Sequence, residues 1–302
     1  AMFSQYFQVR NYYNPAAIGT SDLLNIRLGG RLQWIGVDNA PQTFVAAAEM
    51  PFKLAGKRLG AGLLMQQESL GLYKNLSIGA QIGYKLKLLK GELTIGLQPG
   101  FINQTFKGSD VFIPDDDEYH NSSDNAIPQR DLQGNAFDVA AGVFFTRSNW
   151  WVGVSGTHLT KPSISLKSDT GDTSEVADSY EFTVGRTAYF MAGCNIPIKN
   201  TLFEVMPSLM VMSDFTFYTG EVTARLRYNK FLTAGLGYRY QDAVTFVLGA
   251  EIKGFTIGYS YDYPISAIAK ASSGSHEVFL GYSLKLDFSE KNKNRHRSIR
   301  IM

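Results

Sequence analysis

The chain has 302 residues, of which 44% are hydrophobic and only 19% charged, and its formal net charge is +2. So small a charge excludes the strong positive field typical of nucleic-acid binding, and a single cysteine, Cys194, excludes an intramolecular disulfide. No stretch approaches the roughly 18–20 apolar residues that a membrane helix requires. There is no CxxC pair and no His/Cys cluster with metal-ligand spacing.

Residues 1–25 do not alternate like a strand, yet they are rich in aromatic side chains: Phe3, Tyr6, Phe7, Tyr12 and Tyr13. We do not expect such a segment to float free in water. It either folds into the lumen of the barrel predicted below, as a plug, or covers its periplasmic mouth, or binds a partner. The opening AMFSQYF is not a secretory leader, and we interpret it as a mature terminus after processing.

From residue 26 onward, apolar and polar residues alternate in one run after another, as they do in strands with one apolar face. In 232–241, Leu, Ala, Leu, Tyr and Tyr alternate with Thr, Gly, Gly, Arg and Gln. Many runs match the roughly 9–11 residues of a tilted membrane strand rather than the shorter globular strand. We predict about fourteen strands, with spans 26–36, 42–52, 59–68, 75–88, 92–106, 135–146, 149–158, 180–196, 202–212, 215–228, 232–241, 244–253, 255–262 and 276–288.

Most connections between these runs are short enough to be hairpins, which predicts an up-and-down antiparallel meander. Three are long, 107–134, 159–179 and 263–275, and they follow the fifth, seventh and thirteenth strands. Connections after odd-numbered strands all emerge at one end of such a barrel. Long loops outside and short turns in the periplasm are the outer-membrane pattern. We therefore predict an all-β transmembrane β-barrel over residues 26–288, in the outer membrane, with both termini in the periplasm.

The size of the predicted barrel decides which face meets lipid. About eight strands enclose an interior that side chains can fill, whereas about fourteen leave a wide lumen. The apolar rows are therefore expected to contact outer-membrane lipids, and the polar rows, including Arg225, Arg227 and Arg239, to face a hydrated lumen. A β-propeller is the structural alternative, but the sequence shows no repeat of about 40–50 residues.

The sequence offers no convincing enzymatic or cofactor site. Ser155 and His158 are close in sequence but have opposite parity, so they project from opposite faces of one strand. Residues 115–125 (DDDEYHNSSDN) carry oxygen ligands suited to calcium but lack the spacing and glycine of an EF-hand loop. A solvated acidic loop is the preferred interpretation, with calcium as the alternative.

The last residues, 289–302, form a basic tail that follows the last predicted strand. Against one Glu290 it carries five basic residues: Lys291, Lys293, Arg295, Arg297 and Arg300. The simplest interpretation is a disordered charged end. The functional interpretation is docking to a periplasmic protein.

Five blocks of the sequence together resemble the PorP/SprF family of outer-membrane proteins. They are FSQYFQVRNYYNPAAIG (3–19), RLQWIGVDNAPQTF (31–44), WWVGVSGTHLTKP (150–162), GYRYQDAV (237–244) and GYSYDYPISAIAKASSGSHEVFLGY (258–282). The five blocks together are specific for this family, although no single block is. The loop 107–134 and the basic tail depart from the family pattern.

The resemblance implies a non-enzymatic barrel of the type IX secretion and gliding machinery. Its implied partners are the periplasmic ring lipoprotein and associated proteins, or the C-terminal domain of a secreted adhesin. Asn14-Pro15 also favours a turn, and Asp262 is expected to cap the turn that follows it. From these blocks the resemblance supplies the candidate partner-binding or family-motif residues, which are Asn14, Pro15, Trp34, Pro41, Tyr261, Asp262, Ser266, His276 and Glu277.

Two functions of different classes therefore remain open. One is a docking barrel of the type IX system, which binds proteins at either end. The other is an outer-membrane diffusion channel or transporter for small or apolar solutes, in which the lumen arginines favour anions.

Overall fold

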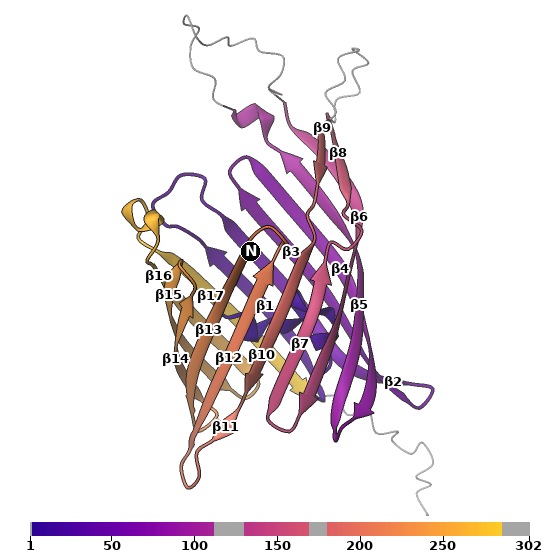
Figure 1. Cartoon of the computed structure of the whole chain (residues 1–302), viewed down its shortest axis with the longest axis vertical. Coiled ribbons are helices and arrows are strands. Elements are labelled where there is room, and N and C mark those ends of the chain that lie inside the picture. Colours follow the sequence, from indigo (N-terminus) through magenta and orange to yellow (C-terminus); the bar gives the residue numbers. More distant parts are fainter. Residues whose placement is uncertain (1, 112–129, 169–179, 286–302) are drawn as a thin grey trace, which may run out of the picture.

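In the computed structural model, which describes residues 2–111, 130–168 and 180–285, the chain forms a closed antiparallel β-barrel (Figure 1). Neighbouring strands follow the order of the chain, and β17 pairs with β1 to close the wall. The strands are β1 (Leu23–Leu32), β2 (Gln42–Leu54), β3 (Lys57–Leu70), β4 (Tyr73–Leu88), β5 (Gly91–Phe106), β6 (Leu132–Arg147), β7 (Trp150–Thr157), β8 (Ser163–Ser168), β9 (Tyr180–Thr183), β10 (Thr187–Cys194), β11 (Ile196–Pro197), β12 (Phe203–Ser213), β13 (Tyr218–Tyr228), β14 (Leu232–Arg239), β15 (Ala243–Ile252), β16 (Phe255–Pro264) and β17 (Ser275–Lys285).

Fourteen of these strands build the wall, which confirms the predicted fold class. β11 continues β10 along the same neighbour, β12. β8 and β9 form a hairpin that pairs only with the first residues of β6 and extends beyond the wall. The predicted strand 180–196 is therefore wrong in one respect. The stretch Val184-Gly185-Arg186 interrupts it, so β9 pairs with β8 while β10 pairs with β7 and β12.

The two ends of the barrel differ, and we call them the loop rim and the turn rim. The strands that precede the three long connections, β5, β7 and β16, all end at the loop rim, in the upper part of Figure 1, in agreement with the predicted parity. Turns at the opposite rim are short, such as Ala55-Gly56 and Lys253-Gly254, in which both residues have positive φ. This is the geometry of type I′ turns, whose twist matches that of the flanking strands.

The outer and inner faces of the wall have the predicted polarity. Leu236 and Tyr238 are 57% and 47% exposed on the outside, where lipid covers them in the membrane. The next residue in the sequence, Arg239, faces the lumen and is 4% exposed. Because side chains alternate along a strand, the pattern of the sequence alone determines these faces.

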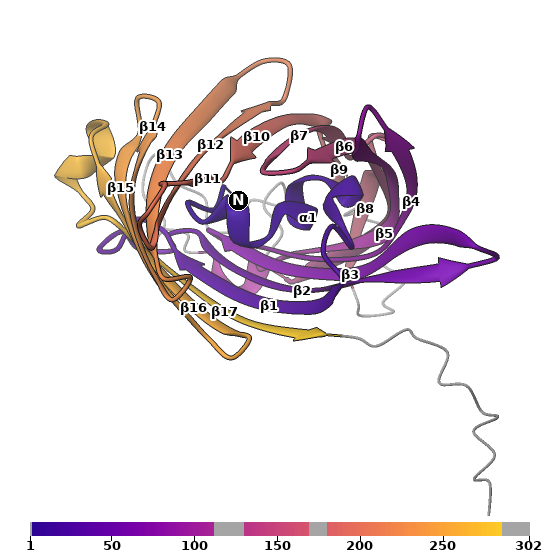
Figure 2. The ribbon, with the colours of Figure 1, turned by 90° about the horizontal axis from the view of Figure 1, so that it is seen from below.

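The N-terminal segment, Met2–Asp22, lies inside the barrel (Figure 2). It forms three short helical turns, η1 (Tyr6–Gln8), α1 (Arg10–Tyr13) and η2 (Pro15–Ala17); beyond it the structure describes η3 (Gly108–Asp110) and η4 (Ala267–Lys270). Across the described ranges, the helices are too short to cross a membrane.

An aromatic core fills the middle of the lumen. Phe3, Tyr6 and Tyr13 have no exposed surface and pack with Phe144 and Phe279 of the wall. The expectation of a hydrated lumen is therefore wrong for this level of the barrel, because the N-terminal segment brings enough apolar volume to exclude water there. Cavities remain above and below it, and the one below is lined mainly by polar groups.

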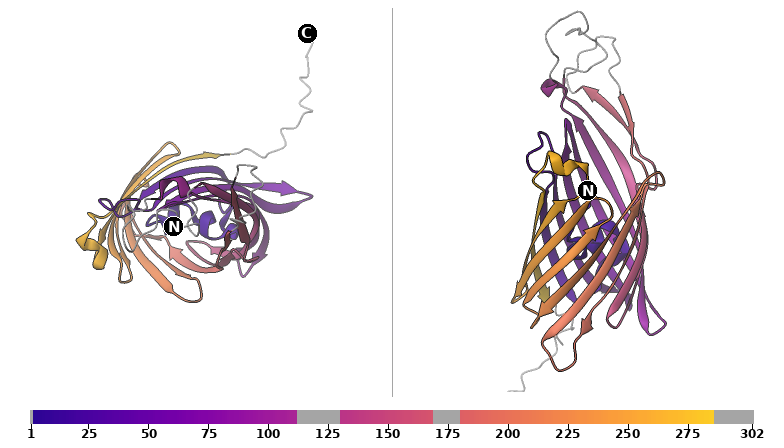
Figure 3. Two further views of the ribbon diagram at one scale, coloured as in Figure 1. Left: turned by 90° about the horizontal axis from the view of Figure 1, so that it is seen from above. Right: turned by 60° about the vertical axis from the view of Figure 1, so that its left-hand side comes forward.

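The N-terminal segment runs through the lumen from the loop rim towards the turn rim. Its first residues lie near the loop rim, where Ser4 bonds to Asp262 close to the end of β16. Seen along the barrel axis, the amino end lies within the outline of the wall (Figure 3). Its last residues reach the turn rim, where Leu23 pairs with Lys285. Met2 is thus not at the turn rim, where we expected the chain to start.

Glycines on the inner face make room for the N-terminal segment. A Cβ atom on Gly96 would lie 2.3 Å from the backbone nitrogen of Ala16, and one on Gly142 would lie 2.2 Å from Asn14 Oδ1. Contacts this short do not occur between real atoms. These two glycines are therefore part of the inner surface on which the N-terminal segment packs, which we call its seat.

Substitution of Gly96 by alanine is expected to loosen the N-terminal segment. Overpacking of this kind costs about 1–3 kcal/mol, which corresponds to about a fivefold or greater rise in the displaced population. Trypsin cleavage after Arg10 in the folded, purified barrel measures that population. Gly220→Ala is the matched control, because its Cβ would meet its nearest neighbours at an ordinary 3.4 Å. Equal cleavage of the two variants would contradict the proposed seat.

Candidate functional site

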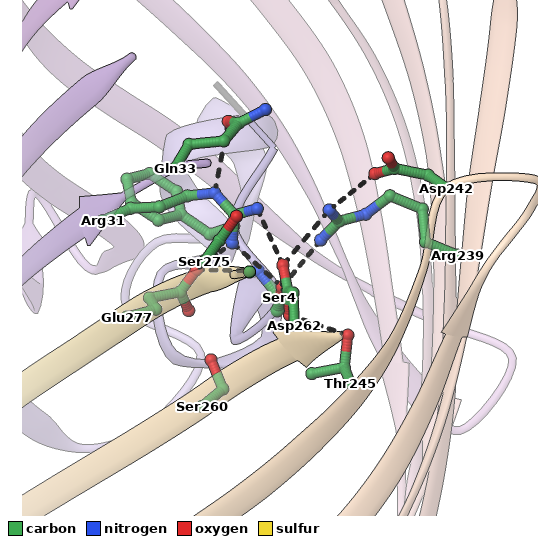
Figure 4. Close-up of polar contacts among 12 residues, drawn as sticks. Ser4, Arg31, Gln33, Arg239, Asp242, Thr245, Ser260, Asp262, Ser275 and Glu277 are labelled. Carbon is green, nitrogen blue, oxygen red and sulfur yellow. Dashed lines mark hydrogen bonds and ion pairs between the residues drawn. The ribbon is translucent and has the colours of Figure 1, made fainter. Parts of the chain in front are cut away.

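A network of buried charges joins five strands below the loop rim, and Figure 4 shows four of its members, Arg31, Arg239, Asp262 and Glu277. Arg31 of β1 contacts Asp262 at 2.7 Å and Glu277 at 3.2 Å. Arg239 of β14 contacts Glu221 of β13 at 2.8 Å and Asp262 of β16 at 3.3 Å. All five side chains are at most 5% exposed. Each charged group contacts at least one group of opposite charge, as burial requires, and the two arginines share three carboxylates.

Ser4 ties the N-terminal segment into this network. Its hydroxyl lies 2.7 Å from both carboxylate oxygens of Asp262, and it accepts hydrogen bonds from Arg31 at 3.1 Å and Arg239 at 2.6 Å. The backbone N–H groups of Ser4 and Gln5 donate to the two oxygens of Glu277 at 2.9 and 2.8 Å. Such saturated groups are suited to holding a segment in place, and they leave no acid or base free for catalysis.

Above the network, a cavity of about 710 Å³ opens at the loop rim; we call it the vestibule. Arg239 lies at its floor, and Met2, Trp34, Pro41, Tyr218 and Tyr240 are among its lining residues. Large aromatic side chains around a polar floor are typical of surfaces that bind other proteins.

The loop between β1 and β2 is pinned to the loop between β16 and β17. Trp34 has a φ of +54° and donates its backbone N–H to Ser275 Oγ at 3.1 Å. Two backbone hydrogen bonds link Ile35 with Ser273 and Gly274, at 2.9 and 2.8 Å. These contacts hold Trp34 at the edge of the vestibule and bring two of the resembling blocks side by side.

The structure separates the candidate residues into three groups. Trp34 and Pro41 line the vestibule, and Asp262 and Glu277 form the network beneath it. Asp262 does not cap the following turn as we expected, because Ser4, Thr245 and two arginines occupy its carboxylate.

The second group lies outside the lumen, at the same end of the barrel. The Tyr261 and His276 rings are 5.2 Å apart, and His276 Nδ1 is 2.7 Å from the hydroxyl of Tyr259. Tyr261 also donates its hydroxyl to the carbonyl of Ser273 at 2.5 Å. Ser266 precedes η4 and its side chain makes no capping hydrogen bond. These residues shape the rim rather than the vestibule.

The third group, Asn14 and Pro15, lies deep in the lumen. Asn14 Nδ2 donates to the carbonyls of Val143 and Val154 at 3.0 and 3.2 Å, and its Oδ1 accepts the N–H of Ala16 at 2.9 Å. Pro15 begins η2 directly after this cap. The predicted turn is present, and Asn14 also fastens it to the wall.

Asn14→Ala is expected to lower the free energy of unfolding by about 1–3 kcal/mol, because three backbone groups, one buried and two partly buried, lose a hydrogen-bond partner. Urea unfolding in lipid vesicles measures the loss. Asn149→Ala is a fitting control, since its exposed side chain makes one hydrogen bond, to Asn195 O at the turn rim. A loss no larger than that of the control would contradict the role of Asn14.

The predicted lumen arginines all face inward, but they differ in their partners. Arg239 belongs to the network, Arg227 pairs with Glu204, and Arg225 stacks on the ring of Phe7 at 3.5 Å. The tail residues 291, 293, 295, 297 and 300 and the acidic loop 115–125 lie outside the described residues, so both interpretations of each stay predictions. Within the described ranges, no group of three or more His, Cys, Asp or Glu is placed to hold a metal ion.

Ser155 and His158 do not form a pair. Ser155 donates to the carbonyl of Tyr13 at 2.7 Å, and His158 contacts Asp138 at 2.9 Å. The sequence reasoning missed Ser4, Arg31 and Glu221 as site residues. For Arg31 and Glu221, the only indication in the sequence was that they fall on the inward-facing rows of their strands. That alternation does not predict which side chains meet across the lumen.

The closed wall, its apolar outer face and its strands of alternating polarity define an outer-membrane β-barrel. The family model described as "Type IX secretion system membrane protein PorP/SprF" matches residues 1–282. The chain therefore belongs to the PorP/SprF family and is a non-enzymatic membrane protein of the type IX secretion system. A search of curated proteins found no match.

Solved structures support the fold alone. The toluene transporter TbuX of Ralstonia pickettii is 11% identical, with a TM-score of 0.52, and the match covers 91% of this chain and 93% of that one. The toluene transporter TodX of Pseudomonas putida is 12% identical, with a TM-score of 0.52 and 94% of each chain covered. A Pseudomonas aeruginosa FadL homologue is 9% identical, with a TM-score of 0.52 and coverage of 91% and 93%.

Proposed function

We propose that this protein is a docking barrel of the type IX machinery and that the C-terminal domain of a secreted cargo protein binds at its vestibule. The observation that carries the proposal is the combination of a filled lumen with an open, aromatic vestibule directly above it. A barrel whose middle is packed with Phe3, Tyr6 and Tyr13 is suited to binding proteins at its ends rather than to passing solutes.

The vestibule has the features of a protein-binding surface. Phe217 and Tyr218, in the connection between β12 and β13 and at the start of β13, are each 66% exposed beside it. Exposed aromatic side chains are enriched where proteins bind, because they bury a large area at low conformational cost. In this proposal the loop rim faces the cell exterior, where secreted cargo is retained.

The turn rim is the proposed place of contact with the periplasmic machinery. In this arrangement the basic tail, 289–302, follows the last strand into the periplasm and docks to the ring lipoprotein or its partners. Deletion of residues 289–302 from the chromosomal gene then reduces co-purification of that lipoprotein while the barrel still inserts into the outer membrane. Unchanged co-purification would remove this part of the proposal.

Site-specific photo-crosslinking in intact cells tests the vestibule. A photoreactive residue at position 34 is expected to capture the C-terminal domain of a secreted protein. The same residue at position 150 is the matched control, because it also replaces a tryptophan, and Trp150 is exposed at the turn rim. Crosslinks to secreted cargo from position 150 and not from position 34 would overturn the proposed docking end.

A diffusion channel for apolar solutes is the second candidate. The observation that favours it is the likeness of fold to two toluene transporters, each with a TM-score of 0.52. Solute uptake by vesicles that contain the purified protein, together with current across planar bilayers, separates the two functions. Steady conductance or toluene uptake by the intact chain would favour the channel over the docking barrel.

A further inference from the structure

The arginines of the lumen fall into two classes. Arg31 and Arg239 are ion-paired with carboxylates in the network at the loop rim. Arg10, Arg27 and Arg225 lie nearer the turn rim. None of these three arginines is within ion-pair distance of a carboxylate in the described ranges, 2–111, 130–168 and 180–285. This difference within one lumen requires an explanation, because an enclosed cation without a counter-charge is costly.

The contacts of these three arginines are weak or incomplete. Arg225 stacks on Phe7, and its buried Nε has no hydrogen-bond partner. The Arg10 guanidinium lies over the rings of Phe144 and Trp151, at 5.8 and 5.1 Å. Both have donors free to bind an acceptor.

Arg27 donates only to neutral oxygens. Its partners are the carbonyls of Ile26 and Tyr282, at 3.0 and 3.4 Å, and Ser283 Oγ, at 3.2 Å. A carboxylate or phosphate would form stronger, charge-assisted hydrogen bonds with the same donors.

These arginines line two adjoining cavities, of about 240 and 150 Å³, which we call together the turn-side cavity. Both are lined by Arg27, Gln8, Phe7 and Glu251; Arg10 lines the larger one and Arg225 the smaller. The larger one extends to Ser21 and Leu23 at the turn rim, and its lining is mostly polar. An anion of a few heavy atoms therefore has both space and a route of entry.

The charges around the turn-side cavity leave an excess of positive charge. Glu49 lines it, but Gly19 N–H and Asn25 Nδ2 occupy its two oxygens. Glu251 lines both parts, whereas Arg227 and Glu204 neutralise each other. Three arginines, Arg10, Arg27 and Arg225, thus face the two carboxylates of Glu49 and Glu251, which leaves one positive charge that a small anion would balance.

We propose that the turn-side cavity binds a small anionic group through its carboxylate or phosphate oxygens, which Arg225, Arg27 and Arg10 hold. Planar guanidinium groups match the paired oxygens of both ligands. The polar donors of Gln8 and Asn11 complete the lining on the side of the N-terminal segment. Since Phe7 and Arg10 belong to that segment, an anion bound here also links it to β1 and β13.

Calorimetric titration of the full chain in detergent micelles tests the proposal. Inorganic phosphate and acetate, at constant ionic strength in sodium chloride, are the probes for the free anion. A short peptide with a free C-terminal carboxylate, compared with its amide, tests a polypeptide source. Saturable binding of at least one of these anions is expected, and its affinity falls about tenfold in Arg225→Met, equivalent to about 1.4 kcal/mol.

Two further variants separate a binding role from a structural one. Glu251→Gln removes a negative charge from the cavity and is expected to strengthen binding about threefold or more, which damage to the fold would not do; it decides the matter if Arg225→Met fails to fold. Arg186→Met is the control, since that side chain contacts Leu159 O outside the cavity, and it leaves the affinity unchanged. Absence of saturable binding, or the same affinity in wild type, Arg225→Met and Glu251→Gln, would overturn the proposal.

Discussion

Deletion of residues 2–21 is expected to convert a closed barrel into a conducting one. The wall closes through the pairing of β17 with β1, and that pairing begins at Leu23, so the truncated chain retains every strand. What it loses is the aromatic core of the lumen, in which Phe3, Tyr6 and Tyr13 are fully buried. About fourteen strands then enclose a wide polar path. Planar-bilayer recordings should show steady current from the deletion variant and none from the intact chain.

Matched variants show whether a current arises from loss of the N-terminal segment or from a misfolded barrel. Gly96→Ala keeps all residues and displaces only the seat of the segment, so it is expected to give intermittent current, while Gly220→Ala stays closed. Heat-modifiable mobility on gels and tryptophan fluorescence verify that each barrel is folded. Closed behaviour of a folded deletion variant would show that the N-terminal segment is not the barrier. Steady current from the intact chain would instead support the diffusion channel.

The alternation of the sequence was sufficient to predict the wall. Each barrel strand has at least eight residues, and a register slip would turn its apolar row inward, so the pattern determines both the strands and their faces. The parity of the long connections followed from the same count. The hairpin of β8 and β9 was missed because its strands have six and four residues and pair beyond the membrane wall.

The contents of the lumen were less predictable, for a physical reason. Aromatic composition indicated that the first residues are packed, but not that they enter from the loop rim. The ion-pair network depends on contacts between residues very distant in sequence, such as Arg31 and Asp262, separated by 231 positions. Alternation says that both point inward; only closure of the barrel and the place of Ser4 bring them together.

Arg31→Met is expected to lower the free energy of unfolding by about 3–5 kcal/mol, because it leaves buried carboxylates without their partner. Asp262 would retain Arg239, but Glu277 would keep only the N–H groups of Ser4 and Gln5. Urea unfolding in lipid vesicles measures the loss. Trypsin cleavage after Arg10 should rise in the same variant, since Ser4 also loses a donor.

Two companion variants show whether charge or packing causes the effect. Asp242→Asn removes the half-exposed edge of the network, 3.1 Å from Arg239, and is expected to cost less than about 1 kcal/mol. The double variant Arg31→Met, Glu277→Gln also removes the carboxylate that Arg31→Met alone leaves unpaired. Its loss of unfolding free energy should therefore be smaller than the sum of the losses of the two single variants. If the losses simply add, the charges act independently, and the network does not anchor the N-terminal segment as a unit.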